Sequence, residues 1–308
     1  MSQIQRVYLI GLGAVGGAYA GRIQEYCPGQ LKVIVDSQRA KRYTESGIKI
    51  NEKLTSFDYV YPGSIKETAD LVIVAVKQHH LEQAISDIKT LIGSDTIILS
   101  LLNGISSEER IGNTYGMDKM LHSFVVATDS VRSGTNIQYS KIGKIVFGDR
   151  EDSAASLKVQ AIRDFFDKAH IPYTIPEDII REQWWKFMMN VGINQVSAVL
   201  RAPYGPFTKP GAARELMFAA SREVIAIAER VGVRLSEDDL AQYAAVLEAI
   251  SPLGKTSMLQ DVEAGRKTEV DIFAGTVIEL GQQYGVATPV NQLLYKLITA
   301  LEEISGNA

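Results

Sequence analysis

The sequence predicts an α/β domain with a doubly wound, mostly parallel sheet, followed by an all-α domain. Two observations predict this class. In the first half, apolar runs rich in β-branched residues alternate with helical stretches, which is typical of parallel strands buried on both faces. After Pro176, almost every segment carries apolar residues at helical spacing. We therefore expect two domains, over residues 1–176 and 177–308.

The elements of the first domain follow from its apolar runs. Four runs predict the main strands, at residues 6–10, 31–35, 70–76 and 96–100. Further strands are expected over residues 120–128 and 170–175, and residues 134–139 and 144–148 are expected to form a pair of strands. Ser153 is a good N-cap, so we expect a helix from Ser153 to Lys168.

The second domain is expected to contain successive helices. Apolar spacing predicts them over residues 178–200, 210–231, 236–250, 270–284 and 289–304. Ser236 is suited to cap the third of these helices, and Gly232 follows the second as a suitable terminating residue.

The first apolar run ends in a glycine-rich loop that opens onto a helix. The loop has the pattern G-x-G-x-x-G and consists of Gly11, Leu12, Gly13, Ala14, Val15 and Gly16. In this pattern the first glycine permits a tight turn, the second lets the backbone approach a pyrophosphate, and the third lets helix pack on strand. The N-terminus of the helix favours phosphate groups. Because alternating strands and helices surround it, the loop predicts a dinucleotide-binding Rossmann domain rather than a non-binding α/β sheet.

Composition narrows the class of protein further. The chain has 308 residues and a net charge of −4, which argues against a nucleic-acid partner. No apolar run reaches the roughly 18 residues of a membrane span, so no membrane partner is expected. The single cysteine, Cys27, cannot form an intrachain disulfide, which indicates a reducing compartment and a cytoplasmic location. His79 and His80 have no further His or Cys at ligand spacing, so no metal site is expected.

Two polar groups interrupt the helical domain. Lys186, Asn190 and Asn194 are spaced i, i+4, i+8 on an otherwise apolar helix, so they lie along one side of it. They form either a buried stripe that needs partners or a strip exposed to solvent. A charged segment over residues 255–271 contains Ser257 and Glu269. It is either functional or a solvated loop in which Ser257 caps a helix and Glu269 complements a helix dipole.

The whole chain resembles the ketopantoate reductase family. Its glycine-rich loop, Ala75-Val-Lys77, Leu102-Asn-Gly104, the polar stripe and the charged segment carry the resemblance. The resemblance implies NADP(H)-dependent reduction of 2-dehydropantoate, a 2-oxo acid, to (R)-pantoate. It implies that Lys186 is the catalytic lysine and Glu269 its partner. By the same resemblance Lys77 and Asn103 lie beside the cofactor, and the groups contacting the substrate are Asn103, Lys186, Asn190, Asn194 and Ser257.

The implied roles agree with the chemistry. Hydride delivered to a carbonyl leaves negative charge on its oxygen, which a lysine can stabilise and protonate. Burial would have to lower the lysine pKa from about 10.4. A carboxylate opposes that change, so Glu269 is expected to orient Lys186 and to accept a substrate hydroxyl.

Three positions depart from the family pattern. Asp36 ends the second strand where the family has a basic residue, which favours the ribose hydroxyls of NAD(H), although Arg39, Lys41 and Arg42 follow. Tyr204 and Gly254 replace two substrate-facing asparagines. These departures favour an alternative, an NADH-dependent D-2-hydroxy-acid dehydrogenase acting on a bulkier or less polar 2-oxo acid. A catalytically idle nucleotide-binding protein is a third interpretation, which the Lys186–Glu269 pair opposes. The sequence leaves a homodimer open.

Overall fold

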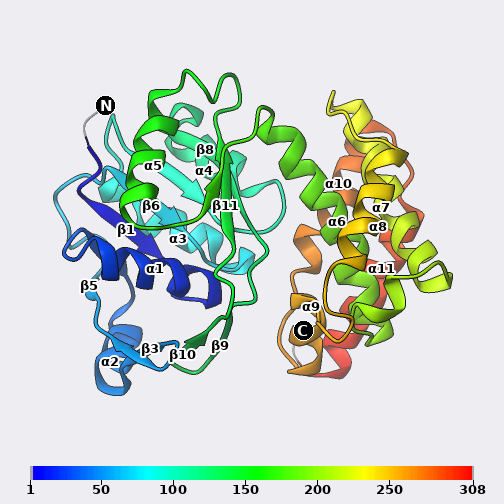
Figure 1. The fold of residues 1–308 in the computed structure, drawn as a ribbon, viewed down its shortest axis with the longest axis horizontal. Helices are drawn as coiled ribbons and strands as arrows, with labels where there is room; N and C mark the ends of the chain where they lie inside the picture. Colours follow the sequence, from blue (N-terminus) through cyan, green and yellow to red (C-terminus); the bar gives the residue numbers. More distant parts are fainter. Residues whose placement is uncertain (1–2, 307–308) are drawn as a thin grey trace. The chain divides into compact units, whose positions relative to one another are not determined.

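The computed structural model describes residues 3–306, and the chain divides into two compact units. Unit 1 contains the chain up to Asn103 together with Ser107–Ile179. Unit 2 contains Gly104–Ser106 and the chain from Ile180 onward. Unit 1 combines sheets and helices, and the elements of unit 2 are helical (Figure 1). The predicted fold class, a mostly parallel α/β domain and an all-α domain, is confirmed.

The main sheet of unit 1 has the strand order β12-β11-β8-β7-β6-β1-β2-β5. Neighbouring strands are parallel apart from β8 and β11, which are antiparallel. Val7 of β1 pairs with both Leu31 of β2 and Leu71 of β6. The strands are β1 (Val7–Ile10), β2 (Leu31–Ile34), β5 (Asp58–Val60), β6 (Leu71–Val74), β7 (Ile97–Ser100), β8 (Met120–Val126), β11 (Lys144–Gly148) and β12 (Tyr173–Thr174).

Alternate residues of the central strands enter two hydrophobic cores. Val7 and Leu9 of β1 face a core that includes α1 (Ala14–Tyr26) and α5 (Leu157–Lys168). Tyr8 and Ile10 face a second core that includes α3 (Leu81–Asp87) and α4 (Ser107–Tyr115). Short 3₁₀ helices η1 (Gln78–His80), η2 (Lys89–Leu91) and η3 (Met117–Lys119) join these elements. The sheet is therefore buried on both faces, as its β-branched runs predict.

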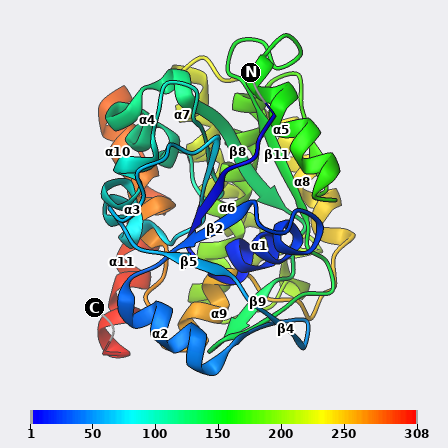
Figure 2. The same ribbon diagram turned by 90° about the vertical axis from the view of Figure 1, so that its left-hand side faces the viewer.

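A second, four-stranded sheet of unit 1 has the order β4-β3-β10-β9 and was not predicted. Its strands are β3 (Ile48–Ile50), β4 (Lys53–Thr55), β9 (Val131–Ser133) and β10 (Asn136–Gln138). It lies at the same end of unit 1 as α2 (Ser37–Ser46), as Figures 1 and 2 both show. The sheet packs on α1 where that helix carries glycines, because a Cβ on Gly17 would overlap Ile137 and one on Gly21 would lie 2.6 Å from Ile50.

Two local predictions need correction. Residues 134–139 and 144–148 do contain strands, but β10 belongs to the small sheet and β11 to the main sheet. The helix expected from Ser153 begins at Leu157 and is capped by Ser156, whose hydroxyl accepts a hydrogen bond from the Val159 N–H. Ser153 instead accepts a hydrogen bond from the backbone N–H of Asp149, so it closes the preceding turn.

Unit 2 is built from helices with one shared core. The helices are α6 (Ile179–Leu200), α7 (Ala212–Arg230), α8 (Glu237–Glu248), α9 (Ser257–Glu263), α10 (Ala274–Tyr284) and α11 (Pro289–Ile304), with 3₁₀ turns η4 (Gly205–Phe207) and η5 (Val270–Ile272). Phe187, Met188 and Val191 of α6 are buried in this core. The capping box of Ser236 and Asp239 begins α8, as the sequence predicts for Ser236.

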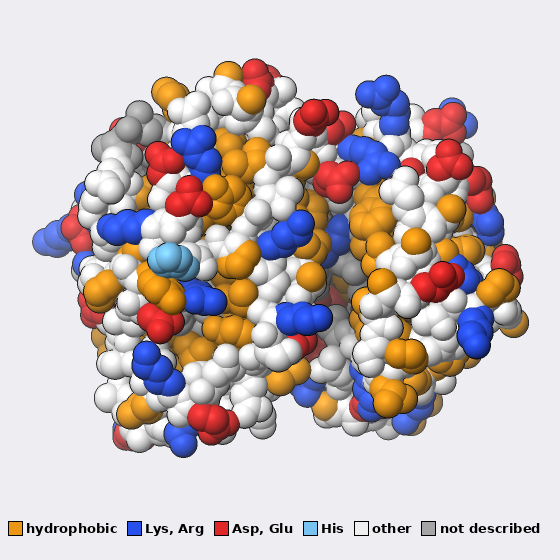
Figure 3. Space-filling model, viewed as in Figure 1, with side chains coloured by type: hydrophobic (Ala, Val, Ile, Leu, Met, Phe, Trp, Pro, Cys, Tyr) orange, Lys and Arg blue, Asp and Glu red, His pale blue; other side chains and the backbone are white. Residues whose placement is uncertain are grey.

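The surface carries both signs of charge. On the face drawn in Figure 3, basic and acidic side chains are interspersed. Among residues 3–306, the helices lack a stretch of the length and apolar character needed to cross a bilayer.

Candidate active site

The glycine-rich loop joins β1 to α1 and lies against the chain that follows β6. Gly11 has a φ of 104°, and a Cβ there would lie 2.5 Å from the carbonyl of Ala75. A Cβ on Gly16 would overlap the carbonyl of Gly11. These two glycines are therefore required by the fold itself.

Gly13 is different, because a Cβ there would meet only one atom within 4 Å, at an ordinary van der Waals distance. The nearest atom to a Cβ on Gly13 would be the carbonyl oxygen of Ala75, at 3.9 Å. Gly13 is also the N-cap of α1, whose first turn has no acidic side chain. An open backbone surface at a helix N-terminus fits the pyrophosphate of a dinucleotide, which is attracted by the helix dipole. Leu12, Ala14 and Val15 complete the loop.

Lys77 and Asn103 follow the carboxyl ends of neighbouring strands. Lys77 comes after β6 and precedes η1, whereas Asn103 comes after β7. Strands β6 and β7 are parallel, so both residues lie at the edge of the sheet where the glycine-rich loop also lies. Both side chains are half-buried. This edge is where open parallel sheets bind ligands.

A buried polar network that was not predicted supports the chain beside Asn103. Ser107 is 2.7 Å from Ser100 and donates to the carboxylate of Glu108, which is 1% exposed. The Ser123 hydroxyl donates to the Ser100 carbonyl, and the Ser123 N–H donates to Glu108. Buried polar groups that satisfy one another fix a unique geometry. The serines are scattered along the sequence, so no local spacing indicates this network.

Asp36 is the N-cap of α2. Its carboxylate accepts a hydrogen bond from the Arg39 N–H at 2.7 Å and pairs with the Arg39 guanidinium at 3.3 Å. Both side chains are exposed. The pKa of His80 is lowered, mainly by burial and then by the positive charges of His79 and Arg39. An acidic group and several basic groups therefore surround the start of α2.

The polar stripe of α6 runs from half-buried to buried positions. Lys186 and Asn190 are half-buried, and Asn194 is 6% exposed. The interpretation as a solvent-exposed strip is therefore wrong for Asn194. A buried amide requires hydrogen-bond partners or a bound polar group.

Ser257 is exposed and is the first residue of α9. The helix is capped by Thr256, which accepts from the Leu259 N–H, so the alternative role of Ser257 as the N-cap is wrong. Thr256 also donates to the hydroxyl of Ser197 on α6, at 3.2 Å. Ser197 lies one turn beyond Asn194, so Ser257 is held near the end of the polar stripe.

Glu269 belongs to a segment that is anchored at both ends within unit 2. The buried carboxylate of Glu302 accepts hydrogen bonds from the N–H and hydroxyl of Thr268, at 2.7 and 2.6 Å. At the other end, the Ala274 N–H donates to Gln195 of α6. Glu269 itself is half-buried and directly precedes η5. The segment that carries Glu269 is thus tied to the helix that carries Lys186.

Tyr204 and Gly254, the two departures from the family pattern, pack against each other. The Tyr204 N–H donates to the Gly254 carbonyl at 2.9 Å. A Cβ on Gly254 would lie 3.0 and 3.2 Å from two carbons of the Tyr204 ring. The ring therefore takes space that a larger residue 254 would need. Burial raises the pKa of the Tyr204 phenol, which keeps it neutral.

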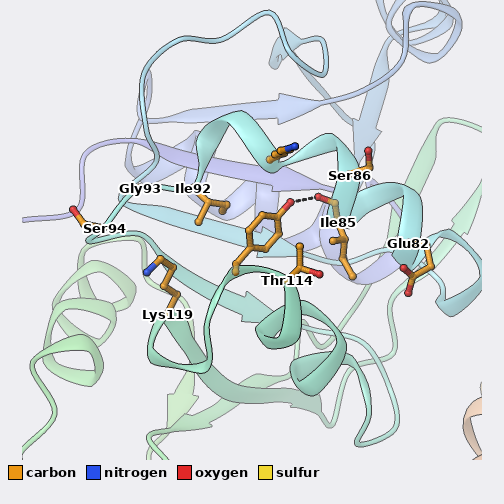
Figure 4. Close-up of a pocket in the computed structure, with 10 residues that line it drawn as sticks. Glu82, Ile85, Ser86, Ile92, Gly93, Ser94, Thr114 and Lys119 are labelled. Carbon is orange, nitrogen blue, oxygen red and sulfur yellow. Dashed lines mark hydrogen bonds between the residues drawn. The ribbon is translucent and has the colours of Figure 1, made fainter.

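A surface pocket of unit 1 lies elsewhere. It has a volume of about 860 Å³ and is lined by residues of α3, α4 and their connections, such as Glu82, Ser94 and Lys119 (Figure 4). The Tyr115 hydroxyl donates to the Ile85 carbonyl beside it. The predicted site residues are not among its lining residues, so this pocket is separate from the candidate site.

Comparisons with known families cover most of the chain. Residues 7–152 match the family model described as Ketopantoate reductase PanE/ApbA. Residues 178–302 match the model described as Ketopantoate reductase PanE/ApbA C terminal.

Individual proteins and structures are similar over nearly the full length. A 2-dehydropantoate 2-reductase of Aquifex aeolicus is 25% identical, with 97% of each chain covered. A structure of D-mandelate dehydrogenase with NADH and anilino(oxo)acetate has a TM-score of 0.87 at 22% identity, covering 98% of this chain and 99% of the other. A dimeric ketopantoate reductase from Staphylococcus aureus has a TM-score of 0.82 at 20% identity, covering 98% and 100%. With both of its halves matched by the family models, the chain belongs to the ketopantoate reductase family.

Proposed function

We propose that this protein is an NAD(P)H-dependent reductase that converts 2-dehydropantoate to (R)-pantoate, for pantothenate and coenzyme A synthesis. The observation that carries the proposal is the anchoring of two segments to one helix. The chain beside Ser257 and the chain that carries Glu269 each donate a hydrogen bond to α6, and α6 itself carries Lys186. The name of the Aquifex aeolicus relative supports the same reaction.

Unit 1 is proposed to hold the cofactor, a nicotinamide dinucleotide that supplies the hydride when bound. Gly13 presents open backbone for the pyrophosphate, and the N-terminus of α1 supplies partial positive charge. Asp36 is proposed to face the adenosine ribose, and Lys77 and Asn103 to face the nicotinamide end. NADP(H) is the family's cofactor, whereas the exposed carboxylate of Asp36 favours NAD(H).

Unit 2 is proposed to hold and protonate the substrate. The Lys186 ammonium stabilises the charge that develops on the carbonyl oxygen, and it donates the proton that completes the alcohol. Glu269 orients Lys186 and accepts a substrate hydroxyl. Asn190, Asn194 and Ser257 bind the remaining polar groups of the 2-oxo acid, together with Asn103.

A second candidate is an NADH-dependent D-2-hydroxy-acid dehydrogenase of the same family. The packing of the Tyr204 ring on Gly254 supports it, because an aromatic surface replaces two amide groups. Such a surface favours a 2-oxo acid with an apolar or aromatic side chain over the hydroxylated chain of 2-dehydropantoate. The similarity to a D-mandelate dehydrogenase structure is compatible with this candidate.

The deciding experiment measures initial rates of NADPH and NADH oxidation with 2-dehydropantoate, 2-oxoisovalerate and phenylglyoxylate. The highest kcat/KM with 2-dehydropantoate would support the first proposal. A preference for phenylglyoxylate with NADH would support the second. Cofactor binding without turnover of any 2-oxo acid would contradict both and would indicate a catalytically idle protein.

We also propose a homodimer, since one similar structure is described as dimeric. Light scattering coupled to size-exclusion chromatography measures the mass directly. A mass near the 33.8 kDa of one chain would contradict the proposal.

A further inference from the structure

We propose that Arg132 holds the glycine-rich loop in its cofactor-binding form and is therefore a positioning residue for the dinucleotide. This inference rests on the part of the proposed function that assigns a nicotinamide dinucleotide to unit 1. It does not depend on which 2-oxo acid is reduced. Arg132 lies on β9, in the small sheet that the sequence did not predict.

The guanidinium group of Arg132 joins three parts of unit 1. One nitrogen, Nη1, donates to the carbonyl of Leu12, inside the glycine-rich loop. Nη2 donates to the hydroxyl of Tyr43 on α2, at 3.1 Å. Nε donates to the carbonyl of Gly134, at 2.8 Å, in the turn that follows β9. The planar fork of an arginine side chain fixes these acceptors relative to one another.

The bond to Leu12 acts where the loop must be rigid. Leu12 lies between Gly11, whose φ of 104° only a glycine adopts easily, and Gly13, where a Cβ would meet only one atom within 4 Å. Two glycines give the free loop many alternative conformations. A charge-assisted hydrogen bond to the carbonyl between them selects one conformation before the ligand arrives. Preorganisation of this kind improves affinity by reducing the entropy lost on binding.

The contact of Arg132 with Tyr43 affects the Tyr43 phenol. Burial raises the pKa of its phenol, but the nearby Arg132 and Arg42 guanidinium groups outweigh burial, so the pKa is lowered. Tyr43 belongs to the helix that begins after Asp36. Arg132 therefore ties the pyrophosphate loop to the helix that carries the proposed ribose-binding residue.

The test is a fluorescence titration of NADPH and NADH binding to wild type, Arg132→Met and Arg132→Lys. We expect Arg132→Met to weaken both cofactors by a similar factor, about tenfold to a hundredfold, as for the loss of a charge-assisted hydrogen bond. Arg132→Lys is expected to recover only part of the cofactor affinity, because an ammonium group cannot make the three hydrogen bonds of the planar guanidinium group. Tyr43→Phe, which leaves the Leu12 bond in place, is expected to have a smaller effect.

Arg22→Met is the matched control. Arg22 lies on α1 and donates to the hydroxyl of Tyr26 at 3.3 Å, an arginine–tyrosine contact without a bond to the loop. Its cofactor affinity should stay at the wild-type value. The KM for the 2-oxo acid should also stay unchanged in Arg132→Lys, which a general loss of structure would not allow.

Three results would overturn the proposal. Wild-type cofactor affinity in Arg132→Met would show that the glycine-rich loop does not need the hydrogen bond from Arg132. Weakening of NADPH alone would show that Arg132 contacts the 2′-phosphate instead of acting through the loop. Failure of the wild type to bind either cofactor would contradict the proposed function as well, so the two failures are distinguishable.

Discussion

The side-chain oxygen of Gln195 accepts a hydrogen bond from the backbone N–H of Ala274, at 3.1 Å. The amide nitrogen of Gln195 donates to the carbonyl of Val191 and to the side chain of Asn291. Asn291 in turn donates to the buried carboxylate of Glu223. Gln195 is fully buried, so its single side chain connects α6, α10 and α11 in the absence of competing water.

Replacement of Gln195 by leucine is expected to destabilise unit 2. The change leaves the Ala274 N–H and the Asn291 carbonyl oxygen without this partner in a buried site, at a cost of about 1–3 kcal/mol each. We expect a lower free energy of unfolding in urea and a reduced kcat, because the segment that carries Glu269 loses one of its anchors.

Gln282→Leu is the control for this prediction. Gln282 lies on α10 but is exposed, so the same change should alter stability by less than about 0.5 kcal/mol. Equal destabilisation by the two variants would contradict the role given to Gln195.

Lys186→Met should abolish most of the turnover and leave the cofactor bound. The variant keeps an unbranched side chain one atom shorter than that of lysine but removes the charge and the proton, so kcat should fall by about 10²–10⁴. Fluorescence titration should give nearly the wild-type affinity for NADPH or NADH. Wild-type turnover would exclude Lys186 as the proton donor.

Gly254→Asn and Tyr204→Asn are expected to be coupled. A side chain on residue 254 meets the Tyr204 ring at 3.0 Å, so Gly254→Asn alone should destabilise the protein. Removal of the ring in the double variant should restore part of that loss, with a coupling energy of about 0.5–3 kcal/mol. The double variant should also raise kcat/KM for 2-dehydropantoate relative to phenylglyoxylate. If the effects of the two single variants simply add in the double variant, both for stability and for kcat/KM, the proposed contact between residues 204 and 254 would be contradicted.

Gly17→Ala tests the contact between α1 and the small sheet. Alanine gains about 1 kcal/mol of helix propensity, but its Cβ overlaps Cδ1 of Ile137, and overpacking costs about 1–3 kcal/mol. The single variant should therefore be less stable than wild type. Ile137→Val removes Cδ1, so Gly17→Ala should become neutral or stabilising in that background, as measured by thermal unfolding.

Asp70 should stabilise unit 1 only above acidic pH. Burial raises the pKa of its carboxyl, but hydrogen bonds from the Arg6 side chain and from the N–H groups of Gln5 and Arg6 outweigh burial, so the pKa is lowered. A carboxyl whose pKa is lower in the folded protein stabilises the fold fully at pH values above its pKa in the unfolded chain, which is near 4. This stabilisation is lost as the pH falls through the pKa of the folded protein.

Asp70→Asn is accordingly expected to lower the free energy of unfolding at pH 7, and the difference from wild type should shrink below about pH 4. Asp164→Asn, which removes an exposed partner of Arg163, is the control and should show little effect. A difference that is independent of pH would show that the shape of the side chain, and not its charge, matters at position 70.

Much of the fold is readable from the sequence because its signals are local. The β-branched runs that contain β1, β2, β6 and β7 alternate with helical stretches, which is typical of a buried parallel sheet, and α6 is apolar enough to be recognised as a core helix. Of the small sheet only β10 lies in a predicted strand, and β3, β4 and β9 escaped prediction because they have three residues each and β3 pairs with β10 across a long stretch of chain. Short strands with distant partners leave no periodic pattern.

The candidate site also has a part that the sequence predicts and a part that only the structure reveals. Residue types and spacing single out Lys186, Asn190 and Asn194 on one helix. The anchors that hold Thr268 and Ala274, by contrast, come from Glu302 and Gln195, whose importance only the folded chain reveals. The site residues themselves stay predictions until the variants above are measured.

The long-range pairing in the small sheet also constrains the order of events during synthesis. Strand β3 pairs with the adjacent β4, but its pairing with β10, through Ile50 and Ile137, must wait until the segment that contains β10 has been translated. At ribosomal rates that interval is on the order of 5–20 s. Throughout it the part of α1 at Gly17 lacks Ile137, which later packs against it. A nascent chain stalled before residue 137 would therefore carry an α1 that is uncovered at Gly17, directly after the glycine-rich loop.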